Sequence, residues 1–132
     1  MAAPPVTSPA ELVRELFAAL DALDTARIEA VAAADVQGVD ELSGGWMRGR
    51  DTLHAYFERI KGAGLTGLRS TASDVATTEW GDAAVVTLVV DQTYTLEGEE
   101  QRMHAPTSIV LRREAGEWRF VLFHSVPLPE EG

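Results

Sequence analysis

The residue best suited to acid/base chemistry in this sequence is a histidine near its C-terminal end. His124, followed by Ser125, ends a segment that carries large apolar side chains at most positions from 118 onward. An imidazole titrates near neutral pH, so His124 could serve as a general acid or base, or donate a hydrogen bond to a bound carbonyl group. The alternative is a structural histidine whose ring is hydrogen-bonded within the fold.

A second candidate is a carboxylate in the acidic segment 35–42. This segment lacks helical periodicity, is predicted to be extended, and carries Asp35, Asp40 and Glu41. If Asp40 faces an apolar pocket, desolvation will raise its pKa toward the value that a base acting near neutrality needs. The alternative is a solvated loop acid in a chain whose net charge is −10.

Aromatic and polar side chains elsewhere could line a binding pocket. Trp46, Tyr56, Tyr94 and His104 would supply apolar walls and polar groups that orient a ligand. Each could equally belong to the core or its rim. No metal site is expected, because the chain has no cysteine and its 3 histidines lie on different predicted elements. The sequence has no glycine-rich phosphate loop, nucleophile elbow or HExxH motif, and no cofactor is expected.

Composition sets broad limits on the class of protein. The chain has 132 residues, of which 45% are hydrophobic, enough for one domain with its own core. Its negative charge disfavours nucleic acid and anionic membranes as partners, and no segment reaches the roughly 20 apolar residues of a membrane span. We expect a cytoplasmic protein with a single domain over residues 8–128, a disordered N-terminus (1–7) and a disordered acidic tail (129–132).

The first half of the chain predicts three helices. Residues 8–11 (SPAE) combine an N-cap serine, a proline at the first helical position and a capping-box glutamate, and apolar residues then recur at helical spacing. Asp24 can cap a shorter helix over Thr25–Ala34. A third helix is predicted over Arg50–Lys61, where two following glycines end it.

The second half predicts four strands, over residues 68–79, 83–96, 101–113 and 117–126. Their connections are short, so successive strands should be antiparallel neighbours. Helices followed by a meander of long strands predict an α+β domain in which a curved sheet wraps the helices. Strict alternation in the final strand puts four side chains on one face: Trp118, Phe120, Leu122 and His124.

Two segments carry a resemblance to a known superfamily. Residues 107–113 (TSIVLRR) and 117–125 (EWRFVLFHS), joined by a glycine turn, resemble the T-x-V-x-x-R, G-x-W-x-I-x-x-F-H-x-S pattern of nuclear transport factor 2-like proteins. Within that superfamily the chain resembles the SnoaL-like domains and the association domain of calmodulin-dependent kinase II, from residue 11 to about 128. The resemblance implies a cone-shaped, cystatin-like α+β fold, with three N-terminal helices packed in the concave face of a curved, mainly antiparallel sheet around a deep pocket.

The resemblance also implies roles for single residues. Asp40 falls where the steroid isomerase branch keeps its proton-transferring aspartate, and Thr107 or Ser108 falls where that branch has a protonated aspartate in its oxyanion hole. Leu16 stands where that branch has a donor tyrosine, so enolate stabilisation of the isomerase kind is not expected. The epoxide hydrolase branch uses an Asp-Arg-Asp set, and this chain has residues of those types whose spacing does not show whether they converge: Asp40, Arg69, Asp74 and Asp91. That alternative stays open.

These observations combine into one predicted site and two functional hypotheses. Asp40, Thr107 and His124 are expected to converge on a cavity as catalytic residues. The first hypothesis is a protein that binds a small hydrophobic molecule, as a cofactor-free isomerase, cyclase or dehydratase of a hydrophobic carbonyl compound. The alternative is a non-catalytic dimerisation or ligand-sensing module. Eight residues are expected to contact the ligand: Leu16, Phe17, Trp46, Tyr56, Phe57, Tyr94, His104 and Ser108.

A homodimer is expected from the apolar residues of the strands. Three short helices cannot cover both faces of such a sheet, and a large apolar face left in water would be a liability. The residues expected on the uncovered faces are Val85, Val89, Val121 and Phe123.

Overall fold

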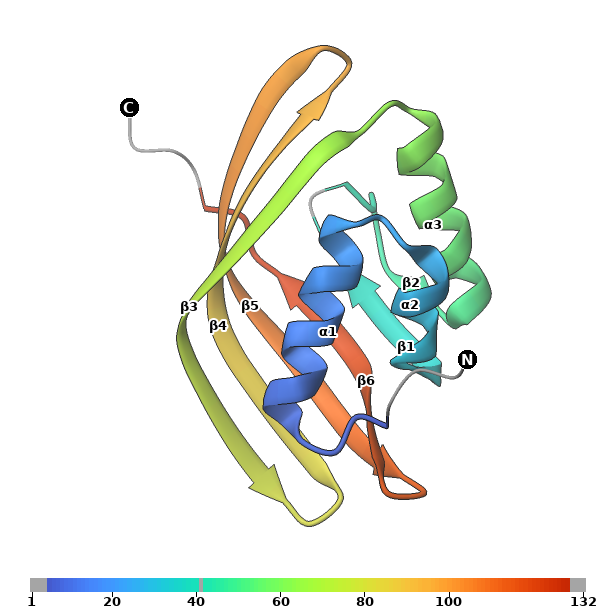
Figure 1. Cartoon of the computed structure of the whole chain (residues 1–132), viewed down its shortest axis with the longest axis vertical. Helices are drawn as coiled ribbons and strands as arrows, with labels where there is room; N and C mark the ends of the chain where they lie inside the picture. Colours follow the sequence, from blue (N-terminus) through green and yellow to red (C-terminus); the bar gives the residue numbers. More distant parts are fainter. Residues whose placement is uncertain (1–4, 41, 129–132) are drawn as a thin grey trace.

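In the computed structural model, three helices lie against one six-stranded sheet (Figure 1). The structure describes residues 5–40 and 42–128. The helices are α1 (Pro9–Asp21), α2 (Thr25–Ala30) and α3 (Arg50–Gly62). The strands are β1 (Ala32–Val39), β2 (Met47–Arg48), β3 (Thr66–Trp80), β4 (Ala83–Leu96), β5 (Glu99–Glu114) and β6 (Glu117–Ser125).

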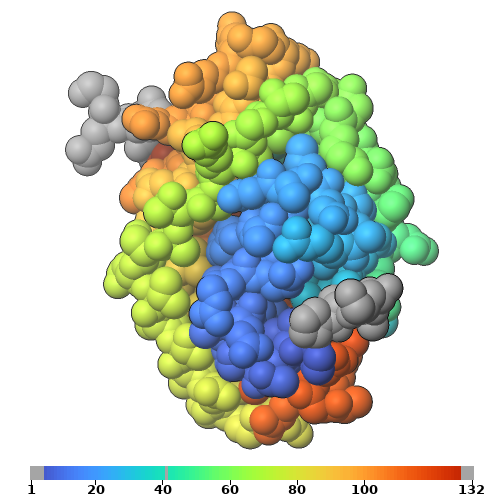
Figure 2. Space-filling model, in the orientation of Figure 1, coloured from blue at the N-terminus to red at the C-terminus, as the bar shows by residue number. Residues whose placement is uncertain are grey.

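The sheet has the order β2-β1-β6-β5-β4-β3 and does not close on itself. Its neighbours are antiparallel except for β1 and β6, which run parallel. The helices cover the concave face, and in Figure 2 the atoms of α1 and α2 lie between those of β3 and α3. The core between helices and sheet includes Leu12 and Leu16 of α1 and Ile109 and Leu111 of β5, each at most 1% exposed. The predicted α+β class and its concave helical layer are confirmed.

The start of α1 follows its sequence signals with one change. The Ser8 Oγ atom accepts a hydrogen bond from the Glu11 amide, as an N-cap residue does. The Glu11 carboxylate, however, accepts from the Thr7 amide and hydroxyl rather than from the Ser8 amide of a standard capping box. Both bonds satisfy groups at the helix start, so the predicted boundary is confirmed.

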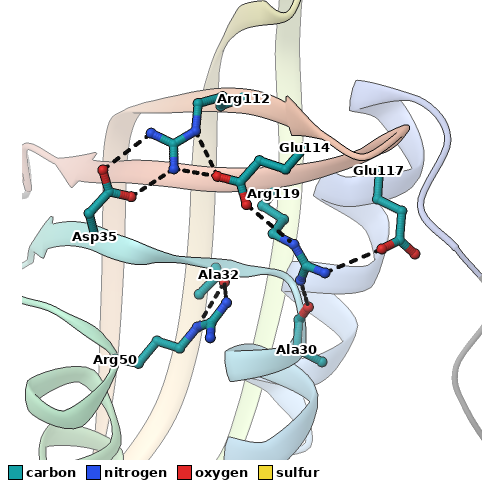
Figure 3. A network of polar contacts seen from close by, with 8 residues as sticks. All are labelled: Ala30, Ala32, Asp35, Arg50, Arg112, Glu114, Glu117 and Arg119. Atoms are coloured by element: carbon teal, nitrogen blue, oxygen red, sulfur yellow. Dashed lines mark hydrogen bonds and ion pairs between the residues drawn. The ribbon is translucent and has the colours of Figure 1, made fainter.

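The second helix is shorter than predicted, because it ends at Ala30 instead of Ala34. The carbonyls of residues 30–32 bind partners from other elements in place of the helix, and Figure 3 shows the bonds of Ala30 and Ala32. Arg119 donates to the Ala30 carbonyl at 2.5 Å, the Phe120 amide to the Val31 carbonyl, and Arg50 to the Ala32 carbonyl at 2.7 and 3.0 Å. Tertiary hydrogen bonds therefore override the helical propensity of the alanines, and residues 32–34 begin β1.

Two arginines face each other across β5 and β6 on the outer side of the sheet. Arg112 and Arg119 are cross-strand partners, an arrangement that is unfavourable for like charges. Figure 3 shows how acidic side chains offset this repulsion, with Glu114 contacting both arginines, Asp35 accepting from Arg112 and Glu117 accepting from Arg119. The pKa of Asp35 lies below its ordinary value mainly because of the hydrogen bonds from Arg112. The network links β5 and β6 to β1.

A β-bulge in β6 changes which side chains point to the core. Val110 of β5 is paired with Leu122 and the next residue, Leu111, with Phe120, which leaves Val121 as an extra residue. The inward set is therefore Trp118, Phe120, Phe123 and Ser125, while Leu122 and His124 face outward. The prediction of strict alternation is wrong after Phe120, because a bulge shifts every later side chain to the opposite face.

The ends of the chain lie partly outside the described residues. Residues 1–4 and 129–132 of the predicted disordered segments are among those that the structure does not describe. Within the N-terminal segment, the Val6 carbonyl accepts a hydrogen bond of 2.9 Å from the Trp118 amide. Across residues 5–40 and 42–128, none of the helices has the length and apolar character needed to cross a membrane.

Candidate functional site

An apolar cavity lies between the helices and the concave face of the sheet. The cavity has a volume of about 60 Å3, counted as the positions that the centre of a water molecule can occupy. A small molecule therefore fits without rearrangement, whereas a larger one requires side-chain movement. Much of the wall is aliphatic and aromatic, from α1, α3 and β6: Leu16, Leu20, Tyr56, Phe57, Ile60 and Phe120.

Asp40 lines this cavity directly after the last residue of β1. Its Oδ1 atom accepts hydrogen bonds from the Leu42 and Ser43 amides, each at 2.9 Å. The Asp40 amide in turn donates to the Ser43 hydroxyl at 3.1 Å. This local turn fixes the carboxylate at the sheet end. The Tyr56 hydroxyl, from α3, donates to Oδ1 at 2.9 Å and to Oδ2 at 2.8 Å. Oδ1 therefore carries most of the hydrogen bonds, and Oδ2 is the oxygen better placed to accept a proton.

The pKa of the Asp40 carboxyl lies above its ordinary value, the direction expected from the sequence. Loss of water around the half-buried carboxylate is the largest cause. The hydrogen bonds from Tyr56, Leu42 and Ser43 favour the charged form and oppose the rise, as does the positive charge of Arg59. The effect of desolvation on the pKa is larger than that of these three hydrogen bonds and the Arg59 charge together. Asp40 is therefore a stronger base than an exposed aspartate.

The raised pKa predicts a specific pH dependence of stability. Between the unfolded and folded pKa values the folded state binds more protons, so the free energy of unfolding should rise as pH falls through the folded pKa, and level off below the unfolded value of about 3.9. Asp40→Asn removes this titration. Urea unfolding from pH 7 to pH 4 should therefore show wild type gaining stability relative to Asp40→Asn. If the difference in free energy of unfolding between wild type and Asp40→Asn stays constant with pH, or changes in the opposite direction, the pKa of Asp40 is not raised.

The structure brings four of the predicted ligand-contacting residues to the cavity. Leu16, Tyr56, Phe57 and Tyr94 all line it. Phe17 is buried but does not line the cavity, and its ring meets that of Phe123 edge-on at 6.5 Å between centroids. Leu16, Tyr56, Phe57 and Tyr94 thus contribute to the wall of the cavity, and Phe17 does not.

Four other predicted site residues lie away from the cavity, and these expectations are wrong. His124 and Ser108 are cross-strand partners on the outer face, where the His124 ring stacks on Trp46 at 6.1 Å between centroids. Trp46 is 48% exposed and borders a separate surface hollow between β2 and α3. His104, also exposed, contacts Asp91 through Nδ1 at 2.6 Å. The bulge explains His124, and the outward register of β5 explains His104 and Ser108.

Thr107 faces inward but reaches the cavity only through a neighbour. Its hydroxyl is 3.0 Å from the hydroxyl of Ser125, which lines the cavity, and donates to the Ala105 carbonyl at 3.1 Å. Both side chains are more than nine-tenths buried. Ser125 thus occupies the place at the cavity that the sequence had given to His124.

Ser125 and Gln92 are the polar cavity residues that sequence reasoning missed. Ser125 could not be assigned to this face without knowledge of the bulge. Gln92 could have been found, because it shares the inner face of β4 with Tyr94 two residues on. Its Nε2 donates to the Ser70 hydroxyl at 2.9 Å, and this hydroxyl in turn donates to Asp21 at 2.7 Å. The relay requires the amide nitrogen of Gln92 to point toward Ser70, which sets the orientation of the amide.

Other arrangements considered from the sequence do not form in the described part of the chain. Arg69, Asp74 and Asp91 do not line the cavity with Asp40, so the Asp-Arg-Asp set of an epoxide hydrolase is not assembled there. Within residues 5–40 and 42–128 there is also no group of three or more histidine, aspartate or glutamate side chains that could hold a metal ion.

A comparison against protein families identifies the domain. Residues 10–129 match the SnoaL-like domain, and the chain therefore belongs to the SnoaL-like domain family of nuclear transport factor 2-like proteins. The resemblance seen in the sequence is confirmed. No curated protein matches the chain in a sequence comparison.

Solved structures extend the comparison. A protein of Thiobacillus denitrificans, provisionally assigned as a calcium/calmodulin-dependent protein kinase type II association domain, is 26% identical with a TM-score of 0.74, covering 96% of this chain and 100% of its own. A ketosteroid isomerase-like protein of Erwinia carotovora (15%, TM-score 0.79) and a provisionally assigned NTF2-like dehydratase of Streptomyces avermitilis (17%, TM-score 0.81) each cover 92% of this chain and 94% of their own. The last two likenesses show the shared fold.

Proposed function

We propose that this protein binds a small hydrophobic carbonyl compound and transfers a proton at the carbon next to the carbonyl group, with Asp40 as the base. The observation that carries the proposal is a carboxylate with a raised pKa in the wall of an apolar cavity. Such a base is suited to removing a proton from carbon near neutral pH. The step is common to cofactor-free isomerases, cyclases and dehydratases.

The contacts of Asp40 support a simple proton transfer. Oδ2 accepts the proton as the C–H bond breaks, and the electron pair moves to the carbonyl oxygen to give an enolate. Tyr56 holds the carboxylate in place through its bonds to both oxygens. Gln92 has a second amide N–H besides the one bound to Ser70, and this group can donate to the oxygen of the ketone. Return of the proton to the same or another carbon completes the reaction.

The test is proton exchange with a small ketone. Cyclohexanone is apolar, and its α-hydrogens exchange with D2O when a base removes them, so NMR follows both binding and exchange. We expect saturable binding, perturbed resonances of Tyr56 and Phe57, and exchange much faster than with an equal concentration of acetate. Saturable binding without accelerated exchange would refute the catalytic proposal and favour a ligand-sensing module. The small volume of the cavity and the likeness to an association domain are the observations that favour this second function.

We also propose that the protein is a homodimer, paired through the outer face of the sheet. Val85 and Val89 of β4, Val110 of β5 and Leu122 of β6 are only partly exposed and face away from the helices. Phe123, which the sequence had placed among such residues, lines the cavity instead because of the bulge. The likeness to an association domain supports assembly through this fold.

Light scattering at micromolar concentration should give about twice the chain mass of 14.3 kDa. Val89→Asp should shift the protein toward monomer, because burying an unpaired carboxylate in the interface is costly. Val75→Asp, the same change at a 55% exposed site on β3, is the control and should remain dimeric. A wild-type protein that is monomeric and soluble would contradict the proposed interface.

A further inference from the structure

The strand register places Ser125 beside the proposed base. Val39 of β1 and His124 of β6 are partners in the parallel pair, and the next residues along the two chains are Asp40 and Ser125. Partner residues of adjacent strands lie about 4.8 Å apart and point to the same face. Asp40 and Ser125 both line the cavity, so a ligand that meets the carboxylate also meets the hydroxyl.

The hydrogen bonds of Thr107 determine whether the Ser125 hydroxyl can donate to a ligand or accept from it. Thr107 has one hydroxyl proton, and it is donated to the Ala105 carbonyl, which can only accept. The contact of 3.0 Å between the two hydroxyls can be made in either direction. Both contacts of Thr107 are satisfied at once only when Ser125 is the donor and Thr107 the acceptor. Within residues 5–40 and 42–128, Thr107 is the hydrogen-bond partner of the Ser125 side chain. In this arrangement the Ser125 oxygen presents lone pairs, and no proton, to the cavity.

An acceptor in an apolar cavity selects the chemistry of its ligand. A carbonyl oxygen cannot donate to Ser125, whereas a hydroxyl group can. A ligand without a donor leaves the Ser125 oxygen desolvated and partly unsatisfied, which lowers its affinity. A charged ammonium group would donate too, but it would pair with the adjacent Asp40 carboxylate and occupy the base that the proposed function requires.

We propose that Ser125 accepts a hydrogen bond from a hydroxyl group of the ligand, and that the ligand is a hydroxylated carbonyl compound with this hydroxyl close to the carbon that Asp40 deprotonates. Thr107 acts as a positioning residue, because it holds the proton of Ser125 away from the cavity. The inference rests on the proposed function and narrows its substrate class.

Dissociation constants for two matched ketones test the assignment. NMR titration of the full chain should show that 2-hydroxycyclohexanone binds about 3- to 10-fold more tightly than cyclohexanone, as expected for one hydrogen bond. Ser125→Ala should remove this preference and still bind cyclohexanone about as well as wild type. Thr107→Val frees the proton of Ser125 to donate to a ketone oxygen, so the preference should shrink or reverse. Thr107→Ser keeps the hydroxyl and should keep the preference.

The outcomes separate this inference from the proposed function. Equal affinity of the wild type for both ketones, or a preference that survives in Ser125→Ala, overturns the role of Ser125 even if proton exchange is observed. A preference that disappears in Ser125→Ala and in Thr107→Val but not in Thr107→Ser establishes that role, even if no exchange occurs and the catalytic proposal fails. If neither ketone binds at millimolar concentration, both proposals fail.

Discussion

Asp40→Asn should lower the rate of α-proton exchange on cyclohexanone by about 10^2- to 10^4-fold, the usual contribution of a positioned base. The side chain keeps its shape, but an amide cannot accept the proton. The dissociation constant of the ketone should change by no more than about twofold, because most of its contacts are with the apolar wall. Exchange measured by NMR in D2O gives the rate, and the titration gives the affinity.

A matched substitution on β1, the strand that directly precedes Asp40, controls for the loss of a negative charge. Asp35→Asn removes an exposed carboxylate that pairs with Arg112 on the outer face of the sheet. It should leave the exchange rate unchanged within about twofold, since exposed ion pairs contribute little to stability.

The wild-type rate should also fall as pH drops through the raised pKa of Asp40, because only the ionised carboxylate is a base. An Asp40→Asn variant as fast as wild type would eliminate Asp40 as the base.

Trp118→Ala should destabilise the protein by about 3–5 kcal/mol, the range for removing a large aromatic side chain from a core. Trp118 is only 2% exposed, on the inner face of β6, and the Arg113 guanidinium lies 5.3 Å from its ring centroid. Truncation leaves a cavity that the rigid sheet cannot close and removes this cation–π contact. Urea unfolding followed by far-ultraviolet circular dichroism, at one protein concentration, measures the loss.

The same substitution at an exposed tryptophan provides the control. Trp80, at the end of β3, is 61% exposed. Trp80→Ala should change the free energy of unfolding by no more than about 0.5 kcal/mol, as is usual for surface positions. A loss at Trp80 as large as that at Trp118 would show that burial in the isolated chain does not govern stability at these positions.

The sequence by itself determined the elements whose signals are local. Ser8 and Asp24 cap their helices as their side chains allow, and both bonds are formed. In β4, buried and more exposed residues alternate from Ala84 to Val90, and the bounds of this strand are those predicted. Caps and alternation involve neighbours in the chain, so they can be identified without knowing the fold. The position of Asp40 at the cavity was expected from the resemblance, and its raised pKa from the effect of desolvation on any buried carboxylate.

Only the tertiary structure decided where α2 ends and which end residue of β6 faces the cavity. The helix stops at Ala30, where Arg119 and the Phe120 amide, which are distant in sequence, bind the Ala30 and Val31 carbonyls that a longer helix would have used. Val121 is an extra residue only relative to its partner strand β5, so the bulge has no signature in the alternation of β6 alone. That one residue turns His124 outward and Ser125 toward Asp40, and it thereby decides which polar groups can meet a ligand.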